Sequence, residues 1–90
     1  MQTVRLKVHG DVQGVSFRSF TKRQAERLGL KGYVKNLGDG TVEAFVEGSK
    51  EKIETLIETL RDGPDRATVH KIDIEWLPYT GLFKDFRVIY

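Results

Sequence analysis

The stretch Val8-His9-Gly10-Asp11-Val12-Gln13-Gly14-Val15-Ser16-Phe17-Arg18 decides how the chain folds and what it can bind. It joins an alternating apolar and polar segment to the start of a helical pattern. Glycines let backbone N–H groups converge on an anion, and a helix N-terminus adds unpaired N–H groups and a positive dipole end. Arg18 adds a planar guanidinium that matches phosphate oxygens. The stretch therefore predicts a strand, a glycine loop and a helix, either as an anion site or as an ordinary tight turn.

The residues around this stretch predict alternating strands and helices. Apolar residues at positions 4, 6 and 8 predict a half-exposed first strand, and a helical pattern follows from about 18 to 28, ended by Gly29. Further strands are expected at about 30–36, 41–47, 68–77 and 86–90. The pair Asp39-Gly40 predicts a hairpin turn between the second and third strands. A second helix is expected from the cap Ser49 to Asp62, with one apolar stripe formed by Ile53, Leu56, Ile57 and Leu60.

This order predicts an α+β fold, a ferredoxin-like α/β sandwich (βαββαβ) whose mostly antiparallel sheet carries two helices on one face. We expect residues 1–90 to form one domain, because a chain of 90 residues has no room for a second core. Since one face of each strand is apolar, the other should meet water. That face carries the charged residues Arg5, Lys7, Glu43, Glu47, Asp73 and Glu75.

Composition narrows the function classes. Hydrophobic residues make up 39% and charged residues 31% of the chain, as in a soluble globular protein. The absence of cysteine excludes disulfides and thiolate chemistry and fits a reducing compartment, so we expect a cytoplasmic protein. The N-terminus lacks a signal-peptide pattern, and no apolar run approaches the length of a membrane span, so no membrane association is expected. The net charge of +2 suits small anionic substrates better than nucleic acid, and a monomer is expected.

Two side chains are candidates for chemistry. Arg18 follows the loop directly, and an oxyanion there could bind its guanidinium and the backbone N–H groups of Gly14, Val15, Ser16, Phe17 and Arg18. Asn36 ends the second expected strand, where its amide could orient a water molecule. Parallel neighbouring strands of a βαβ unit end at one edge of a sheet, which would bring the two together. The alternatives are a solvated first-turn arginine and an asparagine that merely begins a turn.

Other chemistries find little support. His9 points to the polar face and is predicted to be a solvated strand residue, and no residues have metal-ligand spacing, so no metal or cofactor is expected. Ser16 has no evident base and is first a loop residue. The order of elements is shared with RNA-recognition domains, but the expected outer sheet face offers Phe45 between Glu43 and Glu47, a poor platform for bases.

At two segments the chain resembles the acylphosphatase family. The first family motif, aliphatic-x-Gly-x-Val-Gln-Gly-Val-x-Phe-Arg, is filled by residues 8–18. The second, Gly-aromatic-small-x-Asn-x-x-x-Gly-x-Val and a distant Gly, is filled by Gly32, Tyr33, Val34, Asn36, Gly40, Val42 and Gly48. Tyr33 stands where the family often has tryptophan, and Asp11 stands at an often basic position, where it could weaken anion attraction.

The resemblance implies hydrolysis of the carboxyl–phosphate bond of small acylphosphates to a carboxylate and inorganic phosphate, without metal. By analogy, Arg18 and the backbone of residues 14–18 would hold the phosphoryl group, and Asn36 would orient the attacking water. Tyr90 could place its carboxylate near this loop. The alternative is a non-catalytic anion-binding or regulatory interaction domain of the same fold.

Overall fold

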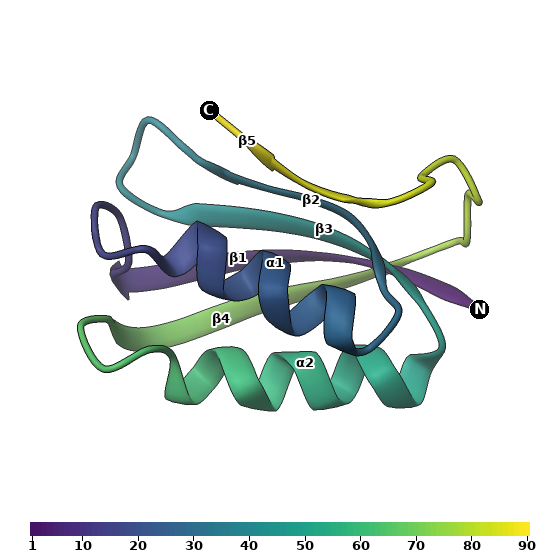
Figure 1. Cartoon of the computed structure of the whole chain (residues 1–90), viewed down its shortest axis with the longest axis horizontal. Helices are drawn as coiled ribbons and strands as arrows, with labels where there is room; N and C mark the ends of the chain where they lie inside the picture. Colours follow the sequence, from purple (N-terminus) through teal and green to yellow (C-terminus); the bar gives the residue numbers. More distant parts are fainter.

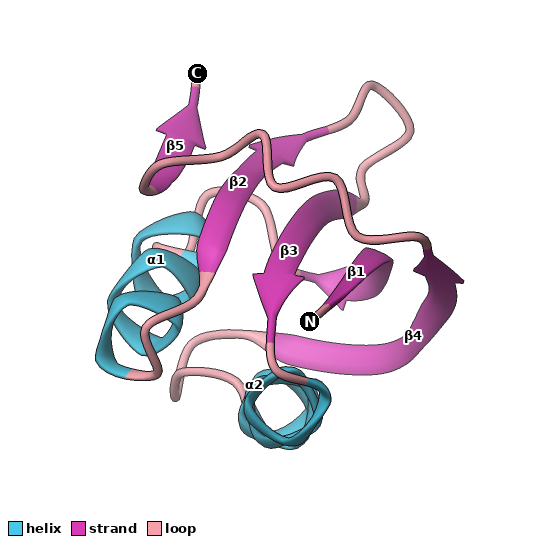
Figure 2. Cartoon of the chain, turned by 90° about the vertical axis from the view of Figure 1, so that its right-hand side faces the viewer, coloured by secondary structure: helices cyan, strands magenta, loops and turns pink.

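Alternating apolar and polar residues form every strand of one sheet. The computed structural model describes residues 1–90 and contains β1 (Gln2–Asp11), α1 (Phe17–Arg27), β2 (Lys31–Asn36), β3 (Val42–Gly48), α2 (Lys50–Asp62), β4 (Thr68–Leu77) and β5 (Phe86–Ile89). The five strands lie in the order β4-β1-β3-β2-β5. Both helices cover the same face of this sheet (Figures 1 and 2). The ferredoxin-like sandwich predicted from the sequence is thereby confirmed. Neither helix combines the length and the apolar character that a membrane span requires.

The order of the strands differs in one detail from the expectation. β1 and β2 run parallel but are not neighbours, because β3 lies between them and pairs antiparallel with both. The only parallel pairing joins β2 to β5. β1 and β2 nevertheless end at the same edge, since Val8 of β1 and Asn36 of β2 both pair with Val42 of β3. That edge, with the loop after β1 and the turn after β2, lies on the left of Figure 1.

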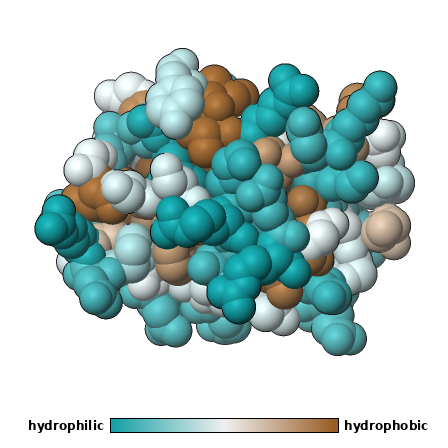
Figure 3. Space-filling view, in the orientation of Figure 1, coloured by the Kyte–Doolittle hydropathy of each residue, from teal (hydrophilic) through white to brown (hydrophobic).

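The core lies between the sheet and the helices. Val4, Leu6 and Val8 are fully buried on the helix-bearing face of β1, opposite the apolar stripe predicted for α2. Outward side chains of the helices are mostly hydrophilic, and the largest hydrophobic area in Figure 3 lies where Figure 1 places the end of β5. The buried face of the sheet fixes how the strands pair, because a shift by one residue would turn the apolar side chains of a strand away from the core.

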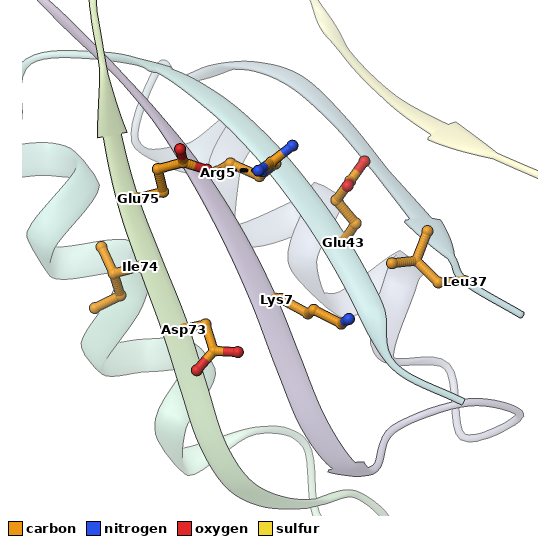
Figure 4. Close-up of a pocket in the computed structure, with 7 residues that line it drawn as sticks. All are labelled: Arg5, Lys7, Leu37, Glu43, Asp73, Ile74 and Glu75. Carbon is orange, nitrogen blue, oxygen red and sulfur yellow. Dashed lines mark hydrogen bonds and ion pairs between the residues drawn. The ribbon is translucent and has the colours of Figure 1, made fainter. Parts of the chain in front are cut away.

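The other face of the sheet is charged, as expected. Arg5 pairs with Glu75 at 2.6 Å and His9 with Asp73 at 2.8 Å, both across β1 and β4. Figure 4 shows a shallow hollow of about 380 Å³ on this face, lined mainly by such charged side chains. Because each of these charged side chains already has an oppositely charged partner, either within the hollow or beside it, the hollow presents no free charge of one sign.

Glu47 is the exception, and the expectation that it meets water was wrong. Its side chain belongs to the charged face, but the connection between β4 and β5 crosses that face (Figure 2) and leaves Glu47 only 3% exposed. The carboxylate accepts hydrogen bonds from the Thr3 hydroxyl at 2.7 Å, from the Thr80 N–H at 3.0 Å, from the Thr80 hydroxyl and from the Gly81 N–H at 3.3 Å. Burial by itself would raise the pKa of Glu47, but these donors outweigh burial and lower it. A buried carboxylate therefore fastens the crossing segment to the sheet.

Candidate active site

The loop between β1 and α1 has an unusual backbone. Gly14 and Ser16 both have a positive φ, 75° and 62°, and Ser16 is the only residue other than glycine with one. Ser16 occupies the position before α1, and its side chain makes no capping hydrogen bond. No acidic side chain occupies the first turn of α1 either, so the first N–H groups of the helix have no protein acceptor to cap them. This backbone is suited to an external anion.

Replacing Ser16 by glycine should raise the free energy of unfolding by roughly 0.5–1 kcal/mol. A left-handed conformation costs about 1–2 kcal/mol for a residue with a Cβ, and glycine removes that cost. Part of the gain is offset, because glycine gives the unfolded chain more conformational entropy. The matched control is Ser49→Gly at the start of α2, where φ is −69° and the hydroxyl accepts from the Lys52 N–H. The Ser49→Gly substitution should lower the free energy of unfolding by a few tenths of a kcal/mol. Urea midpoints of both variants test the opposite signs, and a drop for Ser16→Gly contradicts the strain argument.

The side chain of Arg18 is held from the far end of the chain. Its Nη1 donates to the carbonyl oxygen of Ile89 at 2.9 Å, and its Cζ lies 4.7 Å from the centre of the Tyr90 ring. No carboxylate lies within ion-pair distance of this guanidinium, in contrast to the arginines of the charged face. The contacts to Ile89 and Tyr90 fix the orientation of Arg18 and leave its positive charge for a ligand. Tyr90 thus approaches the loop through its ring.

Asn36 ends β2 on the helix-bearing face. It has the same strand parity as Val34, which is fully buried in the core, and it pairs with the equally buried Val42. Its Oδ1 is buried and has no hydrogen-bond partner in the protein, the only buried side-chain polar atom in this state. An unpaired buried acceptor is costly unless water or a ligand supplies a donor. Asn36 therefore has an open acceptor directed into the side of the sheet that α1 covers.

The structure places Arg18 and Asn36 at the same end of the sheet and on the same face. Ile89, which accepts from Arg18, pairs with Lys35, the neighbour of Asn36 in β2. Val8 of β1 and Asn36 of β2 lie on either side of Val42 in β3. Two strand spacings, roughly 10 Å, therefore separate the backbones of Val8 and Asn36. The sequence-based interpretation of a shared edge is correct, although β3 rather than direct pairing sets the separation.

A cavity of about 260 Å³ opens beside Arg18. Its lining includes Gly14, Ser16, Arg18 and Ser19 from the loop and the start of α1, together with Val88 and Tyr90 from the end of the chain. The side chain of Phe17 is only 1% exposed and belongs to the core, and Val15 packs against the core as well. Of the predicted binding residues, Val15 and Phe17 therefore offer an anion their backbone rather than their side chains. Asn36 does not line this cavity.

Gln13 is a residue of this region that the sequence interpretation missed. Its Nε2 donates to the carbonyl oxygens of Leu37 and Thr41, both at 2.8 Å, and so joins the glycine loop to the turn after Asn36. A glutamine in a loop gives no local signal, and only its place in the first motif sets it apart. His9, by contrast, pairs with Asp73 on the opposite face, and no group of three His, Cys, Asp or Glu residues could hold a metal ion.

Known proteins have a similar sequence and the same fold. Residues 4–88 match the family described as Acylphosphatase. The acylphosphatase of Dehalococcoides mccartyi strain CBDB1 is 46% identical over 89 residues, covering 98% of each chain, and that of Thermococcus kodakarensis is 44% identical, covering 99% of each. The crystal structure of the acylphosphatase from Bacillus subtilis superimposes with a TM-score of 0.96 at 32% identity over the whole of both chains. The chain belongs to the acylphosphatase family of hydrolases.

Proposed function

We propose that the protein hydrolyses the carboxyl–phosphate bond of small acylphosphates, releasing a carboxylate and inorganic phosphate, with no metal ion. In this proposal the phosphoryl group binds the N–H groups of residues 14–18 and the guanidinium of Arg18, and Asn36 orients the attacking water. The observation that carries it is the buried Asn36 Oδ1 without a protein partner, at the sheet edge where Arg18 is anchored. An acceptor in this position can take a hydrogen bond from a water molecule.

Phosphoryl transfer needs positioning and charge stabilisation more than covalent chemistry by the protein. Arg18 has no carboxylate partner, so its charge and the N–H donors that Ile89 does not use are available to the equatorial oxygens of the phosphoryl group. The left-handed backbone at Gly14 and Ser16 and the uncapped start of α1 supply further donors. These groups support phosphate binding without a metal ion.

The leaving group and the nucleophile place modest demands on the protein. A carboxylate leaving group has a pKa near 4, as an Asp or Glu side chain does, so it departs without a general acid. Asn36 is neutral and adds no repulsion beside a phosphate, and the phosphate oxygens can take the proton of the attacking water. The proposal therefore needs no titrating histidine, in keeping with the position of His9 on the opposite face.

The direct test is hydrolysis of an aryl acylphosphate by the purified protein in excess chelator. Turnover that persists in chelator supports the proposed metal-independent reaction. Turnover that appears only when Mg²⁺ is added back would remove the metal-independent part. Absence of turnover under both conditions, combined with phosphate binding in a titration, would instead favour the regulatory anion-binding domain.

Asn36→Ala should lower kcat by roughly 10²- to 10³-fold with little change in KM, because it removes an oriented hydrogen bond to water and leaves the phosphate contacts in place. Steady-state kinetics and inhibition by inorganic phosphate measure the two effects separately. Asn36→Asp is the matched control, since it keeps an acceptor but adds a negative charge beside the phosphate, and it should also be impaired. A variant Asn36→Ala with unchanged kcat would exclude the role in orienting water.

A monomeric state and a cytoplasmic location stay predictions from the sequence. The absence of cysteine supports a reducing compartment.

A further inference from the structure

One side chain joins the two parts of the candidate active site. Gln13 directly precedes Gly14, whose φ is 75°. Its Nε2 donates to the carbonyl oxygens of Leu37 and Thr41, each at 2.8 Å. Leu37 follows Asn36 directly, and no other hydrogen bond joins residues 12–16 to residues 36–41.

We infer that Gln13 is a positioning residue, which sets the separation between the loop that binds phosphate and the amide of Asn36. The inference rests on the proposed function, because it assigns the two ends of the bridge to phosphate and to water. In such a reaction, a displacement of about 1 Å between nucleophile and phosphorus is enough to cost roughly 10²-fold in rate.

The chemistry of the bridge requires a primary amide of this length. The two hydrogens of Nε2 serve one carbonyl each, so the nitrogen is fully used. The carbonyl of Thr41 already accepts from the Leu37 N–H at 2.9 Å, and that of Leu37 accepts from the Gly40 N–H at 3.2 Å. The amide of Gln13 therefore completes both carbonyls. A methionine of similar length offers no donor, and an ionised glutamate would direct a negative oxygen at two carbonyl oxygens.

The turn that receives Gln13 has its own supports. Asp39 accepts from the hydroxyl and the N–H of Thr41, and it pairs with Lys7 of β1 at 2.9 Å on the charged face. With these contacts and the ladder between β2 and β3 intact, loss of the Gln13 amide should loosen the turn relative to the glycine loop without unfolding it. The effect on the reaction can therefore be separated from an effect on folding.

A double-mutant cycle between Gln13→Met and Asn36→Ala tests the inference. We expect Gln13→Met to lower kcat by roughly 10- to 100-fold in the parent and by less than about 3-fold in the Asn36→Ala background, where no oriented water remains to be misplaced. Lys7→Met, which releases the same turn on the opposite face, is the control and should keep the parental kcat. Inhibition by inorganic phosphate should change less than kcat in Gln13→Met.

Three outcomes overturn the inference. They are an unchanged kcat in Gln13→Met, an equal loss in both backgrounds, and a loss matched by Lys7→Met. The second of these is what a merely structural role would produce. If Asn36→Ala itself keeps its activity, the proposed function fails at that residue, and this result is distinct from a failure of the Gln13 arm.

Gln13→Glu gives a second readout, the pH dependence of kcat. Near neutral pH its carboxylate faces two carbonyl oxygens, whereas the protonated acid can donate to one of them. The kcat of this variant relative to the parent should therefore rise several-fold as the pH falls from 7 to 5. A pH-independent ratio contradicts the positioning role.

Discussion

Replacing Arg18 by glutamine is expected to lower kcat/KM by at least about 10³-fold, equivalent to roughly 4 kcal/mol of transition-state stabilisation. Arg18 supplies the only side-chain cation that lines the cavity beside the loop. Glutamine keeps part of the length and one donor group, but it loses the charge and the paired donors that match a phosphoryl group. Steady-state hydrolysis of an aryl acylphosphate measures the loss.

The control for this experiment lies on the same helix. Arg23 is exposed, makes no ion pair and does not line the cavity, so Arg23→Gln should retain parental kinetics while making the same change in net charge. Arg18→Lys should fall between the two, because it keeps the charge but not the planar fork. Equal activity of Arg18→Gln and Arg23→Gln would show that the reaction does not use this guanidinium.

The second large effect concerns stability. Glu47→Ala should lower the free energy of unfolding by about 3 kcal/mol, because it leaves the hydroxyls and N–H groups that now converge on the carboxylate without an acceptor. For a chain of this size the loss corresponds to a fall of roughly 15 °C in Tm. Calorimetry or thermal circular dichroism measures it. A loss below about 1 kcal/mol would show that the segment 78–85 is held mainly by other contacts.

The same carboxylate makes stability depend on pH with a definite sign. Since the folded state lowers the pKa of Glu47, its stabilisation is complete above the unfolded pKa, near 4.3, and is lost as the pH falls through the folded pKa. Glu47→Gln should therefore be less stable than the parent at pH 7 and approach it in acid. Its kinetics at moderate temperature should match those of the parent, because Glu47 pairs with Lys31 at the end of β2 opposite Asn36.

Much of the fold could be predicted because the signals are local. Alternation at Val4, Leu6 and Val8 and the stripe of α2 each need only a short window of sequence. The helix has nearly the expected bounds, whereas β1 is longer than the alternation and takes in Gly10 and Asp11, which were expected in the loop. The burial of Glu47 could not be predicted in this way. Its alternation assigns it correctly to the charged face, but the segment that covers it comes more than thirty residues later.

The candidate site shows the same division. Arg18 and Asn36 could be singled out from motifs, and their common edge follows from parallel strands. The intervening β3 and the anchor of Arg18 on Ile89 depend on pairings that local patterns do not encode. Gln13 is a still clearer case, because its role lies entirely in contacts to residues 24 and 28 positions away.

The anchoring of Arg18 by Ile89 also bears on when the protein becomes active as it folds. The two residues are 71 positions apart, so their contact closes almost the whole chain and carries a large loop-closure entropy. Helix α1 and the hairpin of β2 and β3 are built from far more local contacts and can form before β5 docks. A partly folded chain can thus hold nearly all its secondary structure while its guanidinium is still unanchored. Recovery of activity during refolding would then follow the docking of β5, later than the recovery of the helical signal.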